Sequence, residues 1–358
     1  MTMIAIQESN NFPLLWGDLL FSTTLSQDSE FIYPSYNINF DLPINGNIYP
    51  YRLMQKAYII HPLIAIVCAG NLARMKRFII CIKDYFNTNE ATIENLDLFI
   101  SSYNYCAQDE AYGICIASPE HSRFEYRYLG EWKEKYYSEI GKIATVGSGS
   151  SDFLQTCDSF NTAHSFLKID NYCNAISNVC MVLSSVLGAE RYFASDIKQA
   201  WGAGFEIIAF DYSKNKFVKL DNINYIIWKA KFDTDEEQLT GNPISAMTYK
   251  YIGEALTISS HIGQTPTIYV VLPIYEDPEK FDTSQLTKPF VDSNRICNIY
   301  QIETKEGIIQ PMCVFLEDNS SPQCVFLKYN EQNCFEIYCS QEFSSLVKDE
   351  IKLFFAKK

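Results

Sequence analysis

TMIAIQESNNFPLLWGDLLFS, residues 2–22, is the stretch that decides how we expect this chain to fold. Two short apolar runs flank a polar turn at residues 8–11, and this arrangement predicts a β-hairpin. The hairpin begins with Thr2, and Asp18 falls near the end of its second strand. Cytosolic aminopeptidases remove an initiator methionine when the next residue is small, and Thr2 qualifies. Thr2 would then carry both a hydroxyl and a free α-amine, whose pKa of about 8 allows it to accept the hydroxyl proton.

Two later stretches predict strands followed by helices. KAYIIHPLIAIVCAG, residues 56–70, places Lys56 at the head of a hydrophobic run that ends in Gly70, and we expect one buried strand here. Residues 71–86 then repeat apolar side chains at helical spacing. KIATVGSGSSDFLQTCD, residues 142–158, predicts a strand, a Gly-Ser turn and a helix. The whole order is strands, two helices, strands, two helices and strands, which is typical of an α+β fold.

These pieces, in this order and at these spacings, resemble the proteasome β-subunit family of N-terminal nucleophile hydrolases. In that family the nucleophilic Thr opens the mature chain, an Asp ends the second strand, a Lys precedes a strand ending in Gly, and a GSGS turn opens a helix. The Thr2 to Asp18 and Lys56 to Gly70 intervals match those of the family, and the resemblance covers roughly residues 2–230. It implies a four-layer αββα sandwich, although the order of elements alone allows other α+β layouts.

The resemblance also implies a catalytic site. Thr2 would be the nucleophile, with its own amine as acid and base. Lys56 would lie beside the Thr2 hydroxyl and lower its pKa, and Asp18 would pair with Lys56 to keep it charged and oriented. The backbone N–H of Gly70 would face the oxyanion, where the lack of a Cβ lets substrate backbone approach closely. Ser148 would contact the Thr2 amine from the Gly-Ser turn.

A substrate pocket is implied by four further positions that line the specificity pocket in the family. They are Phe21, Met54, Cys68 and Leu72. Because they are mostly apolar, we expect cleavage after a hydrophobic residue of a peptide or protein substrate; the same side chains would serve equally well as ordinary core. Neither a metal nor a cofactor is expected, since only four His are present and none lies at ligand spacing from a Cys cluster.

Three features depart from the family and leave alternatives open. The family usually has an Asp, followed three residues later by a Ser, before its final Gly-rich strand; Gln199 and Gly202 fall there, and the nearby Asp196 would need a longer loop. The chain begins at Met1 rather than with a propeptide, and retention of Met1 would turn the Thr2 amine into an amide that cannot act as a base. A second hypothesis is therefore a catalytically silent proteasome-like scaffold. A third, weaker one is a non-peptide amidase or acyltransferase on the same fold.

Length and composition set the remaining expectations. A chain of 358 residues predicts two domains or one with a large extension. We place a proteasome-like domain at residues 1–231 and a β-rich C-terminal extension at 232–358, joined by an acidic, turn-rich linker at 233–245. In the scaffold hypothesis this acidic, aromatic-rich extension binds a partner protein.

Charge and cysteine usage restrict the partners. A formal net charge of −14 argues against nucleic acid or an anionic membrane, because both would repel the chain. The twelve cysteines lack paired spacing and no secretory signal is expected, which favours free thiols in the cytoplasm. No stretch is expected to be long and apolar enough to span a bilayer. The family resemblance implies a ring-like homo-oligomer.

Overall fold

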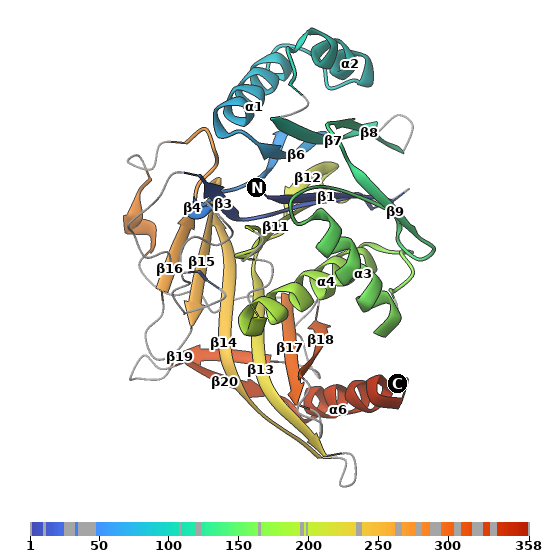
Figure 1. Ribbon diagram of the computed structural model, residues 1–358, viewed down its shortest axis with the longest axis vertical. Helices are drawn as coiled ribbons and strands as arrows, with labels where there is room; N and C mark the ends of the chain where they lie inside the picture. The colour runs from blue at the N-terminus through green and yellow to red at the C-terminus, as the bar shows by residue number, and fades with distance from the viewer. Residues whose placement is uncertain are drawn as a thin grey trace.

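The computed structural model describes most of the chain as a stack of sheets and helices (Figure 1). The described residues are 2–9, 12–24, 33–34, 48–106, 109–118, 123–163, 166–193, 197, 200–233, 238–261, 267–276, 281–286, 295–303, 309–316, 325–329 and 335–356. They contain five α-helices and mostly antiparallel sheets, a mixed composition consistent with the predicted α+β class.

The opening hairpin lies in the middle of a six-stranded antiparallel sheet, which we call the central sheet. Its strand order is β12-β11-β2-β1-β10-β9. The strands are β1 (Met3–Glu8), β2 (Leu14–Asp18), β9 (Lys133–Tyr137), β10 (Gly141–Gly147), β11 (Phe205–Asp211) and β12 (Lys216–Lys219). The predicted hairpin is confirmed, with Ile4 opposite Gly17 and Ile6 opposite Leu15. This register places the start of β1 and the end of β2 side by side.

A four-stranded antiparallel sheet, the upper sheet, packs on one face of the central sheet (Figure 1). It contains β5 (Ala57–His61), β6 (Ile64–Gly70), β7 (Glu110–Ser118) and β8 (Arg123–Leu129). The single strand predicted for residues 56–70 is wrong, because β5 and β6 form a hairpin. Pro62 lies in the turn between them, where a fixed φ and the lack of an N–H favour reversal over a continuous strand.

Two helices cover the outer face of the upper sheet. They are α1 (Leu72–Phe86) and α2 (Ile93–Ser102). The first begins where the Asn71 side chain accepts the N–H groups of Ala73 and Arg74, which satisfies the free donors of the first turn. Its buried face, which includes Phe78, packs on the sheet in one apolar cluster. The second helix ends at Ser102, because Tyr103 takes an extended conformation.

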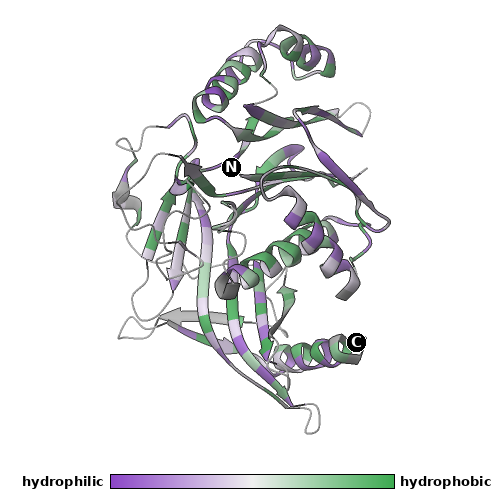
Figure 2. Cartoon of the chain, in the orientation of Figure 1, coloured by the Kyte–Doolittle hydropathy of each residue, from purple (hydrophilic) through white to green (hydrophobic). Residues whose placement is uncertain are grey.

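The other face of the central sheet packs against α3 (Ser150–Ala163) and α4 (Tyr172–Phe193). By length and composition alone, residues 172–190 of α4 could cross a membrane, so the expectation that no stretch reaches that length is wrong. In the fold, 67% of the apolar 18-residue stretch of this helix is buried inside the protein. Figure 2 shows the apolar character of α4 beside the alternating colours of α1, α2 and α6 (Gln341–Ala356).

A third sheet, the lower sheet, lies beyond α3 and α4 (Figure 1). Its order is β16-β15-β14-β13-β17-β18, with β13 and β17 parallel and all other pairs antiparallel. The strands are β13 (Ile223–Asp233), β14 (Gln238–Ile252), β15 (Ala255–His261), β16 (Thr267–Val271), β17 (Arg295–Glu303) and β18 (Ile309–Leu316). Cys297 and Ile299 on its inner face share a cluster with Leu183 of α4.

The prediction of an acidic linker at 233–245 is wrong for residues 238–245, which belong to this sheet. Residues 238–245 form the first half of β14, which pairs with β13 from Asp233 onward. A register shift between Ile227 and Trp228 brings Pro243 opposite Trp228, so a bulge accommodates the proline that suggested a turn. The boundary at 231/232 falls inside β13. The division into two domains stays a prediction.

The remaining elements lie at the edges of this stack. They are β3 (Leu20–Thr23) paired with β4 (Tyr49–Leu53), β19 (Val325–Tyr329) paired with β20 (Phe335–Cys339), the 3-10 helix η3 (Thr283–Leu286) and α6. Phe343 and Val347 of α6 pack against Ile302 and Met312 of the lower sheet. Much of the long segment at 24–55 lies outside the described residues.

His261 at the end of β15 makes folding stability depend on pH. The side chain is buried, with Nε2 3.0 Å from Ser259 Oγ, and burial lowers its pKa to about 4. The unfolded chain, with a pKa of about 6.5, therefore binds the proton first as the pH falls. The stability contributed by neutral His261 is present above about pH 6.5 and is lost as the pH falls toward 4, by about 3 kcal/mol in total.

His261→Gln should remove this part of the pH dependence. Urea unfolding of the wild type and the variant between neutral pH and pH 4 measures the effect. His61→Gln is the matched control, because His61 is only half-buried whereas His261 is buried. Equal slopes of unfolding free energy against pH for wild type and His261→Gln would contradict this prediction.

Candidate functional site

Thr2, Asp18 and Lys56 meet at one end of the central sheet. The Thr2 hydroxyl donates to Asp18 Oδ1 at 2.7 Å, and Lys56 Nζ donates to the same oxygen at 2.6 Å. The hydroxyl and the amino group are therefore neighbours on a single carboxylate oxygen. The three side chains that the sequence predicts to act together come from the residue preceding β1, from the end of β2 and from the residue preceding β5.

The backbone supplies further donors and acceptors to this group. Met3 N–H donates to Asp18 Oδ1 at 2.8 Å, and Gly202 N–H donates to Asp18 Oδ2 at 2.9 Å. Lys56 Nζ also donates to the carbonyl oxygen of Leu20 at 2.5 Å. Both carboxylate oxygens thus have partners, which a fully buried charge needs to avoid a large desolvation cost.

The group is almost closed to solvent. Asp18 and Lys56 are fully buried, and Thr2 is 4% exposed. Burial lowers the pKa of the Lys56 ammonium, because the charged form loses its hydration, while the neighbouring Asp18 carboxylate acts in the opposite direction. A buried ammonium this close to the hydroxyl would stabilise negative charge that develops on Thr2 Oγ1.

Glu206 of β11 positions Lys56 and was missed by the sequence reasoning. Its Oε1 accepts the backbone N–H of Lys56 and, at 2.7 Å, that of Ala57. Its Oε2 lies 3.3 Å from Lys219 Nζ and 3.2 Å from the Tyr251 hydroxyl. The carboxylate therefore fixes the start of β5 and the backbone from which the Lys56 side chain extends. A lone Glu within the apolar run FEIIAFD was the available signal.

A tight turn at residues 200–204 presents the Gly202 N–H to Asp18. Four residues in it have positive φ: Ala200 (63°), Gly202 (102°), Ala203 (62°) and Gly204 (116°). Left-handed alanines are strained and persist only where their surroundings hold them. Here the Ala203 N–H donates to Glu190 Oε2 at 3.0 Å, and the Gly202 carbonyl accepts from Leu19 and Leu20.

The turn contains Gly202, one of the positions that depart from the family pattern. Gly202 stands where a Ser was expected, and a hydrogen-bonding side chain is absent there. Its backbone N–H nevertheless reaches Asp18, so the main chain supplies support to the group at this position. Gln199, Asp196 and Met1 lie outside the described residues.

Gly70 and Ser148 lie near the group, but their predicted roles stay predictions. Gly70 ends β6 with φ +124°, and a Cβ there would fall 2.1 Å from the Asp109 carbonyl oxygen. Cys68 N–H donates to the Lys56 carbonyl at 2.9 Å, which places Gly70, two residues on, at the Lys56 end of the sheet. Ser148 is exposed in the turn before α3. Within the described residues, no hydrogen bond joins Gly70 or Ser148 to Thr2.

The four predicted pocket residues share one apolar cluster. Met54 and Cys68 are buried in it, and Phe21 and Leu72 pack on its margin, half-buried. Burial also raises the pKa of the Cys68 thiol, which keeps it neutral. The cluster is continuous with the core beneath α1, so these side chains have a packing role whether or not they also contact a substrate.

No protein-family model matches the chain, and a search among curated proteins finds no significant match. Within the described residues, no group of three or more His, Cys, Asp or Glu side chains could hold a metal ion. The family resemblance therefore rests on the motifs and on the geometry of the Thr2 group.

Gly147 keeps the Gly-Ser turn against the Thr2 backbone, and replacing it should be costly. Its φ is +107°, and as the last residue of β10 it pairs with Met3 of β1. A Cβ there would fall 1.9 Å from the Thr2 carbonyl oxygen. We expect Gly147→Ala to lower the free energy of unfolding by about 3 kcal/mol or more, because backbone strain adds to a clash with main chain that cannot move aside.

Gly253→Ala is the matched control. Gly253 also has positive φ (+59°), but a Cβ there would meet nothing within 4 Å. Only conformational strain remains, so this variant should lose about 1–2 kcal/mol. Urea unfolding compares the two variants, and equal losses would show that the contact with Thr2 has no energetic weight.

Proposed function

We propose that this chain is a threonine-nucleophile amidohydrolase, a proteasome-like peptidase that acts through Thr2 after removal of Met1. The observation that carries the proposal is the shared carboxylate oxygen of Asp18, which holds the Thr2 hydroxyl and the Lys56 amino group side by side. A nucleophile, a neighbouring cation and an orienting carboxylate are the groups that amide hydrolysis requires beside an oxyanion donor.

In the proposed reaction the Thr2 α-amine accepts the hydroxyl proton while Oγ1 attacks the amide carbonyl carbon. Lys56 stabilises the charge that develops on Oγ1, and Asp18 keeps Lys56 in place. The Gly70 N–H would bind the oxyanion of the tetrahedral intermediate. The α-ammonium then protonates the leaving amine, and water hydrolyses the acyl ester on Thr2 with the amine again acting as base.

The same proposal includes the finer fold assignment, a four-layer αββα sandwich of the N-terminal nucleophile type. Its support is the order in which α1 and α2 cover the upper sheet, the upper sheet packs on the central sheet, and the central sheet packs on α3 and α4. The lower sheet with α6 is an addition to that layer order. A ring-like homo-oligomer, a peptide or protein substrate and a cytoplasmic location belong to this proposal as well.

Cleavage specificity tests the proposal. A panel of fluorogenic peptides that differ only at the residue before the scissile bond should be cleaved about tenfold or more faster after Leu or Phe than after Arg or Glu, because an apolar pocket gains from burying an apolar side chain. Leu72→Gln should weaken this preference. Leu98→Gln is the control, because Leu98 is 63% exposed on α2 and is not a member of the cluster. Cleavage only after charged residues would contradict the assignment.

A catalytically silent scaffold is the second candidate, and the burial of Thr2 favours it. At 4% exposure the hydroxyl leaves little access for a substrate carbonyl. In this case Thr2→Ala would leave every activity and binding property unchanged, and the β-rich extension would bind a partner protein. A non-peptide amidase or acyltransferase would instead react at Thr2 without cleaving any peptide of the panel.

A further inference from the structure

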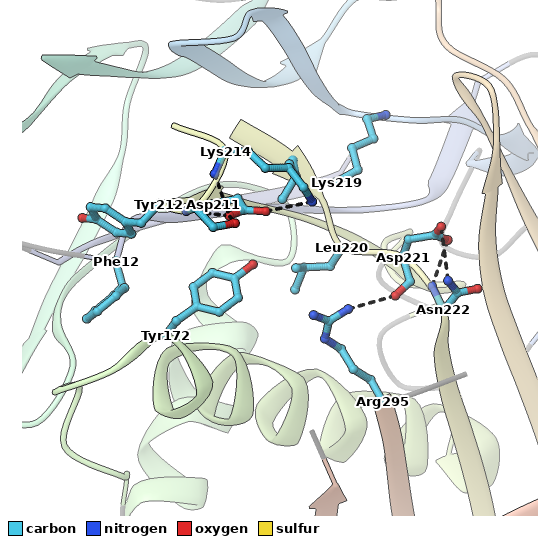
Figure 3. A pocket seen from close by; sticks show the side chains of 12 residues that line it. Phe12, Tyr172, Asp211, Tyr212, Lys214, Lys219, Leu220, Asp221, Asn222 and Arg295 are labelled. Atoms are coloured by element: carbon cyan, nitrogen blue, oxygen red, sulfur yellow. Dashed lines mark hydrogen bonds and ion pairs between the residues drawn. The ribbon is translucent and has the colours of Figure 1, made fainter. Parts of the chain in front are cut away.

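A cavity of about 810 Å³ lies at the end of the central sheet opposite to Thr2 (Figure 3). Phe12, between β1 and β2, and Asp211, at the end of β11, both line it. Asp18 pairs with Phe205 at the other end of β2 and β11. On its β12 side the cavity is lined by Lys219, which lies 3.3 Å from Glu206 Oε2, so the Glu206 carboxylate lies between the cavity and Lys56. The volume of the cavity is in the range of small-molecule binding sites.

One side of the cavity is aromatic. The Phe12 ring lies 5.6 Å from the Tyr212 ring in an edge-to-face arrangement and 6.5 Å from the Tyr172 ring, measured between centroids. The three rings come from the β1–β2 connection, the start of α4 and the turn after β11. Rings held on separate elements in this way form a rigid surface on which a flat apolar group can stack.

The opposite side carries a fixed positive charge. Arg295, at the start of β17, donates from Nη1 to the Asp221 carbonyl oxygen at 3.1 Å, which holds its guanidinium at the cavity. Figure 3 shows this guanidinium and the Tyr172 hydroxyl pointing into the same space. A guanidinium stays charged at any physiological pH and matches the geometry of carboxylates and phosphates.

The two carboxylates that line the cavity are engaged by other donors. Asp211 pairs with Lys214 at 3.0 Å and accepts the Ser213 hydroxyl at 2.6 Å. Asp221 Oδ1 accepts the N–H groups of Asn222 and Tyr251, each at 2.8 Å. The lining thus carries three basic side chains, Lys214, Lys219 and Arg295, against these two carboxylates, a formal excess of one positive charge.

We propose that this cavity binds a small aromatic anion, with its ring against Phe12, Tyr172 and Tyr212 and its carboxylate or phosphate on Arg295. The site is distinct from the Thr2 group and does not depend on the proposed hydrolase activity. A ligand of this class satisfies both sides of the cavity, because its ring replaces water on the aromatic surface while its anionic group pairs with the guanidinium.

Isothermal titration calorimetry of the full chain with three matched probes tests the proposal. The probes are 1-naphthoate, 1-naphthyl phosphate and the neutral 1-naphthamide. At least one anion should bind saturably with one site, about tenfold or more tighter than the amide. The tighter of the two anions decides between a carboxylate and a phosphate ester. Thr2→Ala should bind the same probes unchanged, which separates this proposal from the hydrolase.

Arg295→Gln should weaken anion binding about tenfold or more. The matched control is Arg123→Gln, because Arg123 is an exposed arginine of β8 that pairs with Glu125. If Arg295→Gln fails to fold, Tyr172→Leu replaces it and should weaken all three probes. The proposal is overturned if the amide binds as tightly as both anions, if no probe binds at millimolar concentration, or if the folded variant binds like the wild type.

Discussion

Thr2→Ala is expected to lower kcat/KM for amide hydrolysis about 10⁴-fold or more, the scale of loss when a hydrolase loses its nucleophile. Fold should be retained, because Asp18 Oδ1 keeps its bonds to the Met3 N–H and Lys56 Nζ. Loss of one hydrogen bond to a charged group should cost about 1.5–3 kcal/mol of unfolding free energy. Steady-state cleavage of the best fluorogenic peptide, together with urea unfolding, measures both effects.

Thr2→Ser is the control for this variant. Serine keeps the hydroxyl and is small enough for Met1 removal, as is alanine, so both variants present the same processed terminus. Thr2→Ser should keep measurable hydrolysis while Thr2→Ala does not. Equal rates in wild type and Thr2→Ala would remove Thr2 from the chemistry, and the absence of hydrolysis in both would support the scaffold.

Lys56→Met should be the most damaging change for stability. It leaves the Asp18 carboxylate fully buried without its cation, which typically costs about 3–5 kcal/mol. It should also lower hydrolysis about 10²–10³-fold, because the charge beside Thr2 Oγ1 is lost. Lys135→Met is the matched control: its pair with Asp158 has the same 2.6 Å distance but is 44% exposed, so its loss should cost less than about 1 kcal/mol.

The double variant Asp18→Asn/Lys56→Met separates structure from chemistry. Removing both charges abolishes the unpaired buried ion, so unfolding free energy should recover much of what Lys56→Met lost. Hydrolysis should stay as low as in the single variant, because no cation adjoins the nucleophile. Recovery of activity together with stability would mean that the ion pair is only structural.

The sequence alone predicts that Thr2, Asp18 and Lys56 act together, because each residue belongs to a local sequence pattern. Thr2 and Asp18 bracket one hairpin, and hairpin register is a short-range property. The error at residues 56–70 arose because an apolar run of this length does not distinguish one buried strand from a hairpin with a tight turn at Pro62. Residues 238–245 form a strand instead of the predicted linker because they pair with β13, and this pairing overrides the turn-forming residues among them.

Long-range contacts explain what the sequence did not predict. Glu206 lies 150 positions beyond Lys56, and only the packing of β11 beside β5 brings its carboxylate to the Lys56 N–H. The Gly202 N–H reaches Asp18 because Glu190, on another element, holds a strained turn in place. Such partners have no fixed spacing in the chain, so neither motif nor periodicity reveals them.

The most direct test of Thr2 as a nucleophile is the mass of the purified protein before and after reaction with a β-lactone probe, followed by peptide mapping of the adduct. We expect a mass that lacks Met1 and a single adduct on Thr2, absent from Thr2→Ala. Retention of Met1 would leave Thr2 without the free amine that the mechanism requires. That result, or an adduct that survives in Thr2→Ala, would contradict the assignment of Thr2 as the nucleophile.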